Sequence, residues 1–241
     1  MSKLLTPEHY DHIVSINVDI QNDFCPGGAL GVHDGDQVVE PMNAVNRYVR
    51  DNNGTVIFTR DWHPRATNHF NTHGGPWPPH CIAYQAGAAF HEDLIVDTAK
   101  GDYVASKGTR PDVDDYSGLM AIVDGFSLWN GRDYTRSVSV SDMLRFGLGQ
   151  AIHERRLQIK KLDKIAVLVG GLATDYCVKA TALDVVSEIK RADVFLIEDA
   201  VRAVNVSPDD GAQALIEMRS AGIRMVTSND ITAGKILEAV S

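Results

Sequence analysis

The feature that most constrains this chain is the alternation of short β-branched runs with longer amphipathic segments. Residues 13–20 read IVSINVDI and residues 55–59 read TVIFT, and each run is short and bounded by turn-forming residues. Between them, residues 36–51 carry apolar side chains from Val38 to Val49 at the spacing of one helix face. The pattern therefore predicts a strand, a helix and a second strand.

The same alternation returns in the last third of the chain. The apolar runs IAVLVGG and DVFLIED flank a helical segment at residues 176–191. A further helix is predicted from Ser207 and Pro208 to Gly222, followed by the strand IRMVTS and a helix over residues 230–240. Near-continuous apolar strands joined by helices are typical of a parallel sheet covered on both faces. We therefore expect an α/β fold with three layers, α-β-α, around a mostly parallel sheet.

The middle of the chain is less regular. The segment DYVASK predicts a weaker strand that ends near Lys107, whereas residues 124–140 predict an irregular excursion. Ser141 is a candidate N-cap for the helix that follows. The apolar face of that helix would comprise Met143, Leu144, Leu148 and Ile152. Since no repeat or linker divides the chain, we expect a single domain over residues 1–241 with an insertion around residues 118–160.

Composition limits the partners and the compartment. The formal net charge of -9 argues against nucleic acids and anionic membranes, because both require a concentrated positive field. No apolar stretch approaches the roughly 18 to 20 residues of a membrane span, and the N-terminal residues lack an apolar signal core. Three widely spaced cysteines favour a reducing compartment. We expect a cytoplasmic protein whose partner is a small molecule.

Polar side chains stand at the carboxyl ends of the predicted strands, the edge at which open α/β sheets bind ligands. Asp19 closes the first strand, and Asp61 follows the second by two residues. Lys107 closes the third strand, and Cys177 lies just past the fourth. Each of these residues alone has an ordinary structural interpretation, such as a loop cap, a solvated cation or a small buried hydrophobe. Together they combine a thiol, carboxylates and a cation at one edge, which favours a catalytic site.

Cys177 lies in the segment GLATDYC, at the predicted start of a helix. With Thr174 or Asp175 as N-cap, its sulfur would lie in the first turn, where free N–H groups and the helix dipole stabilise a thiolate. An ammonium group from Lys107 would lower the pKa of the thiol further. The same turn can aim the backbone amides of Ala173 and Cys177 at a developing oxyanion. These features favour a nucleophile over a packing residue or a metal ligand.

A second cluster follows the second strand. Asp61, His63 and His69 lie in RDWHPRATNHF, and His80 follows in PWPPHC. Mixed carboxylate and imidazole ligands suit a divalent ion such as zinc, manganese or iron, with water in the open positions. A histidine-rich surface loop is the alternative, since the chain has nine histidines. The D-x-H pattern directly after a parallel strand favours the metal site.

Five segments of the chain occur in an order that is found in one known family. The motifs VDIQNDF, RDWHP, PWPPHC, SKG and GLATDYCV resemble those of the nicotinamidases among the isochorismatase-like cysteine hydrolases. The resemblance extends over about residues 13–235. It implies the isochorismatase-like hydrolase fold and the hydrolysis of nicotinamide to nicotinate and ammonia in NAD salvage. Pyrazinamide would also be a substrate, whereas benzamide would bind poorly.

The resemblance also implies roles for individual residues. Asp19, Lys107 and Cys177 are similar to the catalytic triad, and Ala173 and Cys177 to the oxyanion hole, which follows a cis peptide bond after Leu172. The implied metal ligands are Asp61, His63 and His80, with His69 as a further ligand found in some members. The implied contacts to the pyridine ring are Phe24, Leu30, Trp77 and Tyr116. One divalent ion, zinc foremost, would bind the ring nitrogen directly or through water and so orient the carboxamide.

In the implied mechanism, Asp19 accepts the proton of Cys177, the thiolate attacks the carboxamide carbon, and water then hydrolyses the thioester. The main alternative is a related cysteine amidohydrolase that acts on another amide or an N-carbamoyl substrate, although such members generally lack the Asp/His cluster. An inert ligand-binding α/β module is the alternative from another class. Cys177 argues against isochorismatases proper, which use no cysteine nucleophile. Extra residues lie between Tyr116 and Ile165. The sequence therefore does not determine the shape of one side of the pocket or the oligomeric state, and a homo-oligomer is one of the alternatives.

Overall fold

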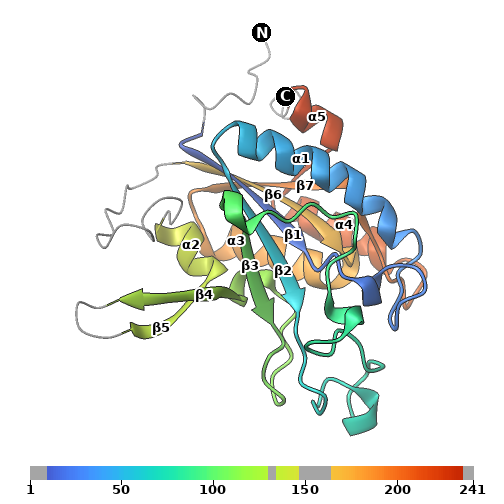
Figure 1. Cartoon of the computed structure of the whole chain (residues 1–241). Helices are drawn as coiled ribbons and strands as arrows, with labels where there is room; N and C mark the ends of the chain where they lie inside the picture. Colours follow the sequence, from blue (N-terminus) through green and yellow to red (C-terminus); the bar gives the residue numbers. More distant parts are fainter. Residues whose placement is uncertain (1–9, 130–133, 147–163, 236–241) are drawn as a thin grey trace.

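The computed structural model describes residues 10–129, 134–146 and 164–235, and one sheet runs through its centre (Figure 1). The strand order is β5-β4-β3-β2-β1-β6-β7-β8. Neighbouring strands are parallel from β3 to β8 along this order, and β4 and β5 join antiparallel at one edge. The mostly parallel sheet is thus confirmed. The strands are β1 (His12–Val18), β2 (Thr55–Asp61), β3 (Tyr103–Lys107), β4 (Ile122–Trp129), β5 (Tyr134–Ser139), β6 (Ile165–Leu172), β7 (Ala192–Arg202) and β8 (Arg224–Val226).

Helices cover both faces of the sheet, as the three-layer prediction requires (Figure 1). One apolar core lies beneath α1 and α5, and a second lies beneath α2, α3 and α4 on the other face. No helix in the described part of the chain is long and apolar enough to cross a membrane. The helices are α1 (Val39–Asp51), α2 (Val140–Phe146), α3 (Lys179–Glu188), α4 (Asp210–Ser220) and α5 (Ser228–Thr232).

From Ile13 to Val18, β1 is buried on both faces although this run contains Ser15 and Asn17. Val14, Ile16 and Val18 lie in the core beneath α3. Ser15 and Asn17 point the other way, toward Asn46 of α1. The Ser15 hydroxyl donates to Asn46 Oδ1 at 2.8 Å, and Asn46 Nδ2 donates to Asn17 Oδ1 at 2.8 Å. The buried polar groups therefore satisfy one another and fix α1 against the sheet.

The central position of β1 creates a switch point in the sheet. From β1 the chain proceeds through β2 and β3 to one side, and from β6 through β7 and β8 to the other. Ligands of open α/β sheets bind at the carboxyl ends of the strands beside such a point. Asp61 is the last residue of β2, not two residues beyond it as predicted, because β2 pairs with β3 as far as Asp61 and Lys107. Asp19 directly follows β1 at the same edge.

The predicted irregular excursion over residues 124–140 is wrong, because β4 and β5 occupy most of it. Two features hide these strands in the sequence. The pairing of β4 with β5 contains register shifts, so apolar and polar residues do not alternate regularly. The charged Asp124 lies within β4, where Arg60 Nη2 donates to it at 2.6 Å and the Ser106 hydroxyl at 2.8 Å. The carboxylate is partly exposed and binds Arg60 of β2 and Ser106 of β3.

Two predicted helix starts are also displaced. Ser139, not Ser141, caps α2: its hydroxyl accepts from the Asp142 N–H at 3.1 Å, and Asp142 Oδ2 accepts from the Ser139 N–H at 3.0 Å. Helix α4 begins at Asp210, whose carboxylate accepts from the Ser207 N–H at 2.7 Å and so holds Ser207 outside the helix. Gly222 follows α4 with a φ of 91°, as predicted for a helix end. Leu148, Ile152 and residues 236–240 lie outside the described residues.

Candidate functional site

Lys107 lies at the centre of a buried cluster at the carboxyl edge of the sheet. Its Nζ lies 2.9 Å from Asp19 Oδ2, 2.5 Å from Asp61 Oδ1 and 3.4 Å from Cys177 Sγ. The side chains of Lys107, Asp19 and Asp61 are exposed by only 1%, 0% and 6%. The strand-end argument thus placed these four residues together correctly, and their roles stay predictions. A carboxylate, an ammonium and a thiol in contact can transfer a proton and support a nucleophile.

Asp19 is held in place by its neighbours on β2. It follows β1 with a φ of 49°, a left-handed conformation that turns the chain out of the sheet. Its N–H donates to the carbonyl of Thr59 at 3.2 Å. The Thr59 hydroxyl donates to Asp19 Oδ1 at 2.7 Å, which leaves Oδ2 for Lys107. Thr59 was not a predicted site residue, because a buried threonine in a strand gives no signal in the sequence.

Cys177 lies in a wide π-helical turn, Thr174–Val178, that precedes α3, and the Val178 N–H donates to the Ala173 carbonyl at 3.1 Å. Neither predicted N-cap is used. Ala173 precedes the first turn, and the Asp175 carboxylate accepts from the N–H groups of Val204 and Asn205 at 3.0 and 2.8 Å. The peptide bond between Leu172 and Ala173 is cis, as the family resemblance implied. The turn is thus fixed by a neighbouring loop rather than by its own cap.

The pKa of the Cys177 thiol differs from the prediction. Burial raises this pKa well above its ordinary value, and the carboxylates of Asp19 and Asp61 raise it further. Lys107 lowers the pKa of the thiol as predicted, but it is outweighed. Burial also raises the pKa of Asp19, and Lys107 only partly opposes this effect. The thiol is therefore protonated in the free protein, and a nucleophilic role requires a base in contact with it.

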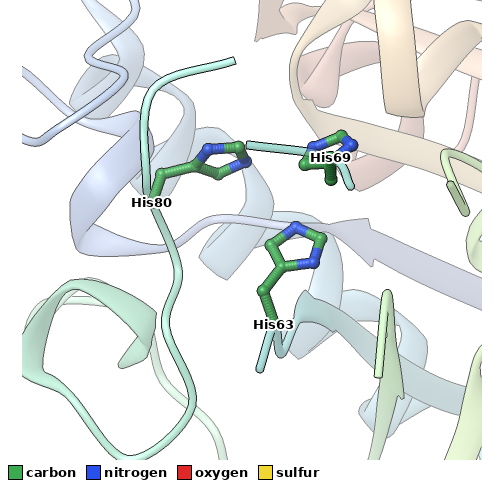
Figure 2. Close-up of side chains that lie close together, drawn as sticks. All are labelled: His63, His69 and His80. Atoms are coloured by element: carbon green, nitrogen blue, oxygen red, sulfur yellow. The ribbon is translucent and has the colours of Figure 1, made fainter. Parts of the chain in front are cut away.

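Three imidazole rings meet beside this cluster, and Figure 2 shows them facing a common space. The side chains of His63, His69 and His80 are buried, and the nearest pair of ring centroids, those of His63 and His69, is 4.6 Å apart. One ligand nitrogen of each ring lies within 4.8 Å of those of the other two. The rings come from three points along the segment that follows β2. A surface loop, the alternative weighed for these histidines, is therefore excluded.

The chemistry of the three rings fits a divalent metal. His63 Nδ1 lies 3.0 Å from the carbonyl oxygen of Gly108, and His80 Nδ1 lies 2.7 Å from that of Pro78. Each Nδ1 therefore donates its proton to a carbonyl, which leaves the Nε2 lone pair for a ligand. His63 Nε2 is buried without a hydrogen-bond partner. Burial, above all, lowers the pKa of His80 to about 4, so its ring is neutral and can coordinate a metal.

Asp61 joins the histidines to the lysine cluster. Its Oδ1 contacts Lys107, and its Oδ2 lies 3.6 Å from His63 Nε2. Burial alone would raise the pKa of Asp61, but Lys107 and His63 together hold it below its usual range. Gln21, which was not predicted, donates to the Asp61 carbonyl and accepts from its N–H, both at 2.8 Å. Asp61 is thus an ionised carboxylate whose backbone is fixed by an amide side chain.

A small pocket opens onto both clusters. Phe24, Leu30, Trp77 and Tyr116, the four residues predicted to enclose a ring, all line it, as does Ala173. Tyr176, next to Cys177 in the sequence, and Val204 also line the pocket and were not predicted; Val204 follows β7 and reaches this side only through the fold. Trp77 Nε1 donates to the Tyr116 hydroxyl at 3.0 Å, and the Tyr176 ring packs edge-on against Trp77. The other residues lining it are Asp61, His69, His80 and Cys177.

Fold and site together define a class of protein. Its members are three-layer α/β proteins with a buried cysteine, carboxylate and ammonium at the carboxyl edge of a parallel sheet, beside a histidine cluster. A sequence model described as the Isochorismatase domain matches residues 14–115 of this chain. The nicotinamidase of Escherichia coli (strain K12) is 36% identical over 228 residues, which make up 88% of this chain and 93% of that relative. The chain therefore belongs to the isochorismatase family of hydrolases.

Two solved structures share both fold and sequence with the chain. The pyrazinamidase of Pyrococcus horikoshii in complex with zinc is 34% identical with a TM-score of 0.66, and the match covers 90% of this chain and 99% of that one. The protein PnC1 of L. infantum in complex with nicotinate is 31% identical with a TM-score of 0.67, over 90% and 93% of the two chains. The chain thus spans nearly the full length of these relatives.

Proposed function

We propose that the protein is a nicotinamidase that hydrolyses nicotinamide to nicotinate and ammonia and also accepts pyrazinamide. One observation carries this proposal: the thiol, carboxylate and ammonium cluster and the three-histidine cluster open onto the same aromatic pocket. The first cluster suits attack on an amide, and the second suits recognition of a ring nitrogen. Relatives at 31 to 36% identity that are named nicotinamidase or pyrazinamidase, or bind nicotinate, support the substrate.

In the proposed reaction, Asp19 removes the proton of Cys177 as the sulfur attacks the carboxamide carbon. The raised pKa of Asp19 makes it a stronger base, and the raised pKa of the thiol means that its proton leaves only as the carbon–sulfur bond forms. Asp19 then protonates the departing nitrogen, so that the C–N bond breaks and ammonia leaves a thioester on Cys177. A water molecule, deprotonated by Asp19, attacks the thioester and releases nicotinate and the thiol.

Two further groups stabilise charge in these steps. The backbone N–H groups of Ala173 and Cys177, both at the pocket wall, are proposed to bind the oxyanion. Burial alone would lower the pKa of Lys107, but Asp19 and Asp61 raise it well above its ordinary value. Lys107 is therefore permanently charged and balances the carboxylates while the proton moves from sulfur to Asp19.

We propose that His63, His69, His80 and Asp61 hold one divalent ion, with zinc as the first choice and manganese or iron as alternatives. When bound, such an ion would supply a Lewis-acidic point for the substrate ring. Phe24 and Trp77 would enclose that ring and fix the carboxamide against Cys177. The cytoplasm is the proposed compartment, which the three free thiols support.

An ammonia-release assay tests the function and its alternatives together. The purified protein is given nicotinamide, pyrazinamide, benzamide and an N-carbamoyl amino acid in parallel, with Cys177→Ala as the inactive control and Cys25→Ala as the matched cysteine control. We expect release from the first two substrates, little from benzamide, and loss of activity only in Cys177→Ala. Release from the N-carbamoyl substrate alone would identify a related amidohydrolase, and no release from any substrate would indicate an inert module.

A further inference from the structure

Three consecutive residues of the loop after β3 contact the three parts of the site. Asp114 contacts the ring of His69, the Asp115 carbonyl accepts from Lys107 Nζ at 3.2 Å, and the Tyr116 hydroxyl accepts from Trp77. The histidine cluster, the lysine cluster and the pocket wall thus all depend on one short segment. Its first residue, Asp114, has no role in the proposed reaction.

The contact of Asp114 is with one atom of a candidate metal ligand. A carboxylate oxygen of Asp114 meets Nδ1 of His69. The side chain of His69 is 6% exposed, whereas that of Asp114 is 43% exposed, so the carboxylate forms the solvent side of the pair. His63 and His80 use backbone carbonyls for the corresponding nitrogen. The Nδ1 atom of His69 therefore has a side-chain carboxylate as its partner, whereas the Nδ1 atoms of the other two histidines have backbone carbonyls.

We propose that Asp114 is a positioning residue that makes His69 a ligand of the metal site. By accepting the Nδ1 proton, Asp114 fixes the tautomer in which the lone pair lies on Nε2, and it fixes the ring orientation at the same time. A carboxylate partner also increases the basicity of the coordinating nitrogen more than a carbonyl does. The inference rests on the proposed metal site. It assigns Asp114 as the outer hydrogen-bond partner of His69, the fourth proposed protein ligand.

The loop that carries Asp114 is tied to the segment that carries His69. The Asn68 N–H donates to the Pro111 carbonyl at 2.8 Å, and the Thr67 hydroxyl donates to the same carbonyl at 3.1 Å. That hydroxyl also accepts from the His69 N–H at 3.2 Å. Both members of the pair are thus held by one hydrogen-bonded junction, which reduces the entropy lost when the carboxylate fixes the ring.

Zinc affinity, measured by competition with a chelating dye on metal-free full-length protein, tests the inference directly. Asp114→Ala should bind zinc about 10 to 100 times more weakly, the range typical of lost outer partners of histidine ligands. Asp114→Asn retains an acceptor oxygen and should lose less. The matched control is Asp112→Asn, which removes the same charge from an exposed position in the same loop. It should change the affinity less than twofold.

A double-mutant cycle separates positioning from a general structural effect. If Asp114 acts through His69, adding Asp114→Ala to a His69→Ala variant should weaken zinc binding little further. The visible absorption spectrum of the cobalt-loaded protein should change in Asp114→Ala and stay unchanged in Asp112→Asn. Wild-type zinc affinity in Asp114→Ala would overturn the inference, as would fully additive losses in the cycle.

The ammonia-release assay on the same preparations keeps the two proposals apart. If the wild-type protein hydrolyses nicotinamide while Asp114→Ala binds zinc normally, the inference about Asp114 fails and the proposed function stands. If the wild-type protein hydrolyses none of the amides but the Asp114→Ala variant binds zinc more weakly than the wild type, the proposed function fails and the positioning role stands.

Discussion

Cys177, Asp19 and Lys107 share a space from which water is nearly excluded, and this decides how the cysteine can react. The helix start and the ammonium group favour a thiolate, but burial and two carboxylates oppose it. Opposition prevails because burial raises the pKa of the thiol more than Lys107 lowers it, and Asp19 and Asp61 raise it further. A thiol of this kind is inert until a substrate allows proton transfer and carbon–sulfur bond formation to proceed together.

Alkylation of Cys177 tests the role of Lys107 in this balance. Because the pKa of the thiol is raised, iodoacetamide should label Cys177 slowly at neutral pH and faster as the pH rises. Lys107→Met removes an ammonium group that lowers this pKa, so the alkylation profile should move to still higher pH. It should also cost about 3–5 kcal/mol of stability, because buried carboxylates lose their partner.

The control for this experiment is Lys100→Met, which removes an exposed lysine paired with Asp97. Its alkylation profile and stability should match the wild type. An alkylation profile that is the same in Lys107→Met and in the wild type would remove the electrostatic role of Lys107.

Thr59 contributes to the pKa of the proposed base, Asp19. Its hydrogen bond favours the ionised form of Asp19 and so lowers the pKa of a carboxyl that burial raises. Thr59→Val should raise that pKa further, and since the base must be ionised, the acidic limb of kcat/KM against pH should move to higher pH. The loss of a buried bond to a charged group should cost about 1.5–3 kcal/mol.

Thr55→Val is the matched control, because it removes a side-chain contact with His12 at the other end of β2. Its pH profile should equal that of the wild type. An unshifted acidic limb in Thr59→Val would show that Asp19 is not the group that titrates in this limb.

At the scale of elements, strands made of regular apolar runs were predictable from the sequence. Strands and site residues that depend on polar contacts with other segments were not. The strands beside the switch point are nearly continuous runs of apolar residues, so their presence and parallel direction followed from the pattern, whereas their order in the sheet comes from the structure. The β4–β5 hairpin was not predicted because its register shifts interrupt the regular alternation and the charged Asp124 lies within β4. The strand ends revealed Asp19, Lys107 and Cys177, whereas Gln21, Thr59 and Asp114 depend on contacts that the sequence does not display.

Helix α2 offers a direct comparison of the predicted and the observed cap. Ser139→Ala removes the hydroxyl that accepts from the Asp142 N–H and should destabilise the protein by about 0.5–2 kcal/mol in urea unfolding. Ser141→Ala should cost less, because Ser141 lies inside α2 with a longer contact of 3.4 Å to Glu188. A larger loss in Ser141→Ala than in Ser139→Ala would contradict the observed helix start.

At the scale of the whole molecule, the switch point gathers residues that are far apart in the chain. Segments after β1, β2, β3, β6 and β7 all reach the pocket, so the site forms only when the sheet is complete. A ligand that bridges these segments should therefore stabilise the entire fold. The single domain over residues 1–241 stays a prediction, as does the homo-oligomer.

Zinc tests the metal site itself, whose proposed ligands all come from β2 and the segment that follows it. Added to metal-free protein at about 100 times its Kd, zinc should stabilise the fold by about 2.7 kcal/mol. For a chain of this size, each kcal/mol corresponds to about 2–4 °C in Tm. His80→Ala should abolish most of the rise, whereas His33→Ala, which removes a histidine whose side chain is 93% exposed, should leave it intact. An equal zinc response in the two variants would argue against the metal site.

The thioester on Cys177 is the central claim, and mass spectrometry of the intact protein tests it most directly. The protein is mixed with nicotinamide, quenched in acid during turnover and weighed, and the modified peptide is then identified. We predict a mass increase of one nicotinoyl group on the peptide that contains Cys177, and no increase in Cys177→Ala. Turnover of nicotinamide without any adduct, together with an active Cys177→Ala, would contradict the account.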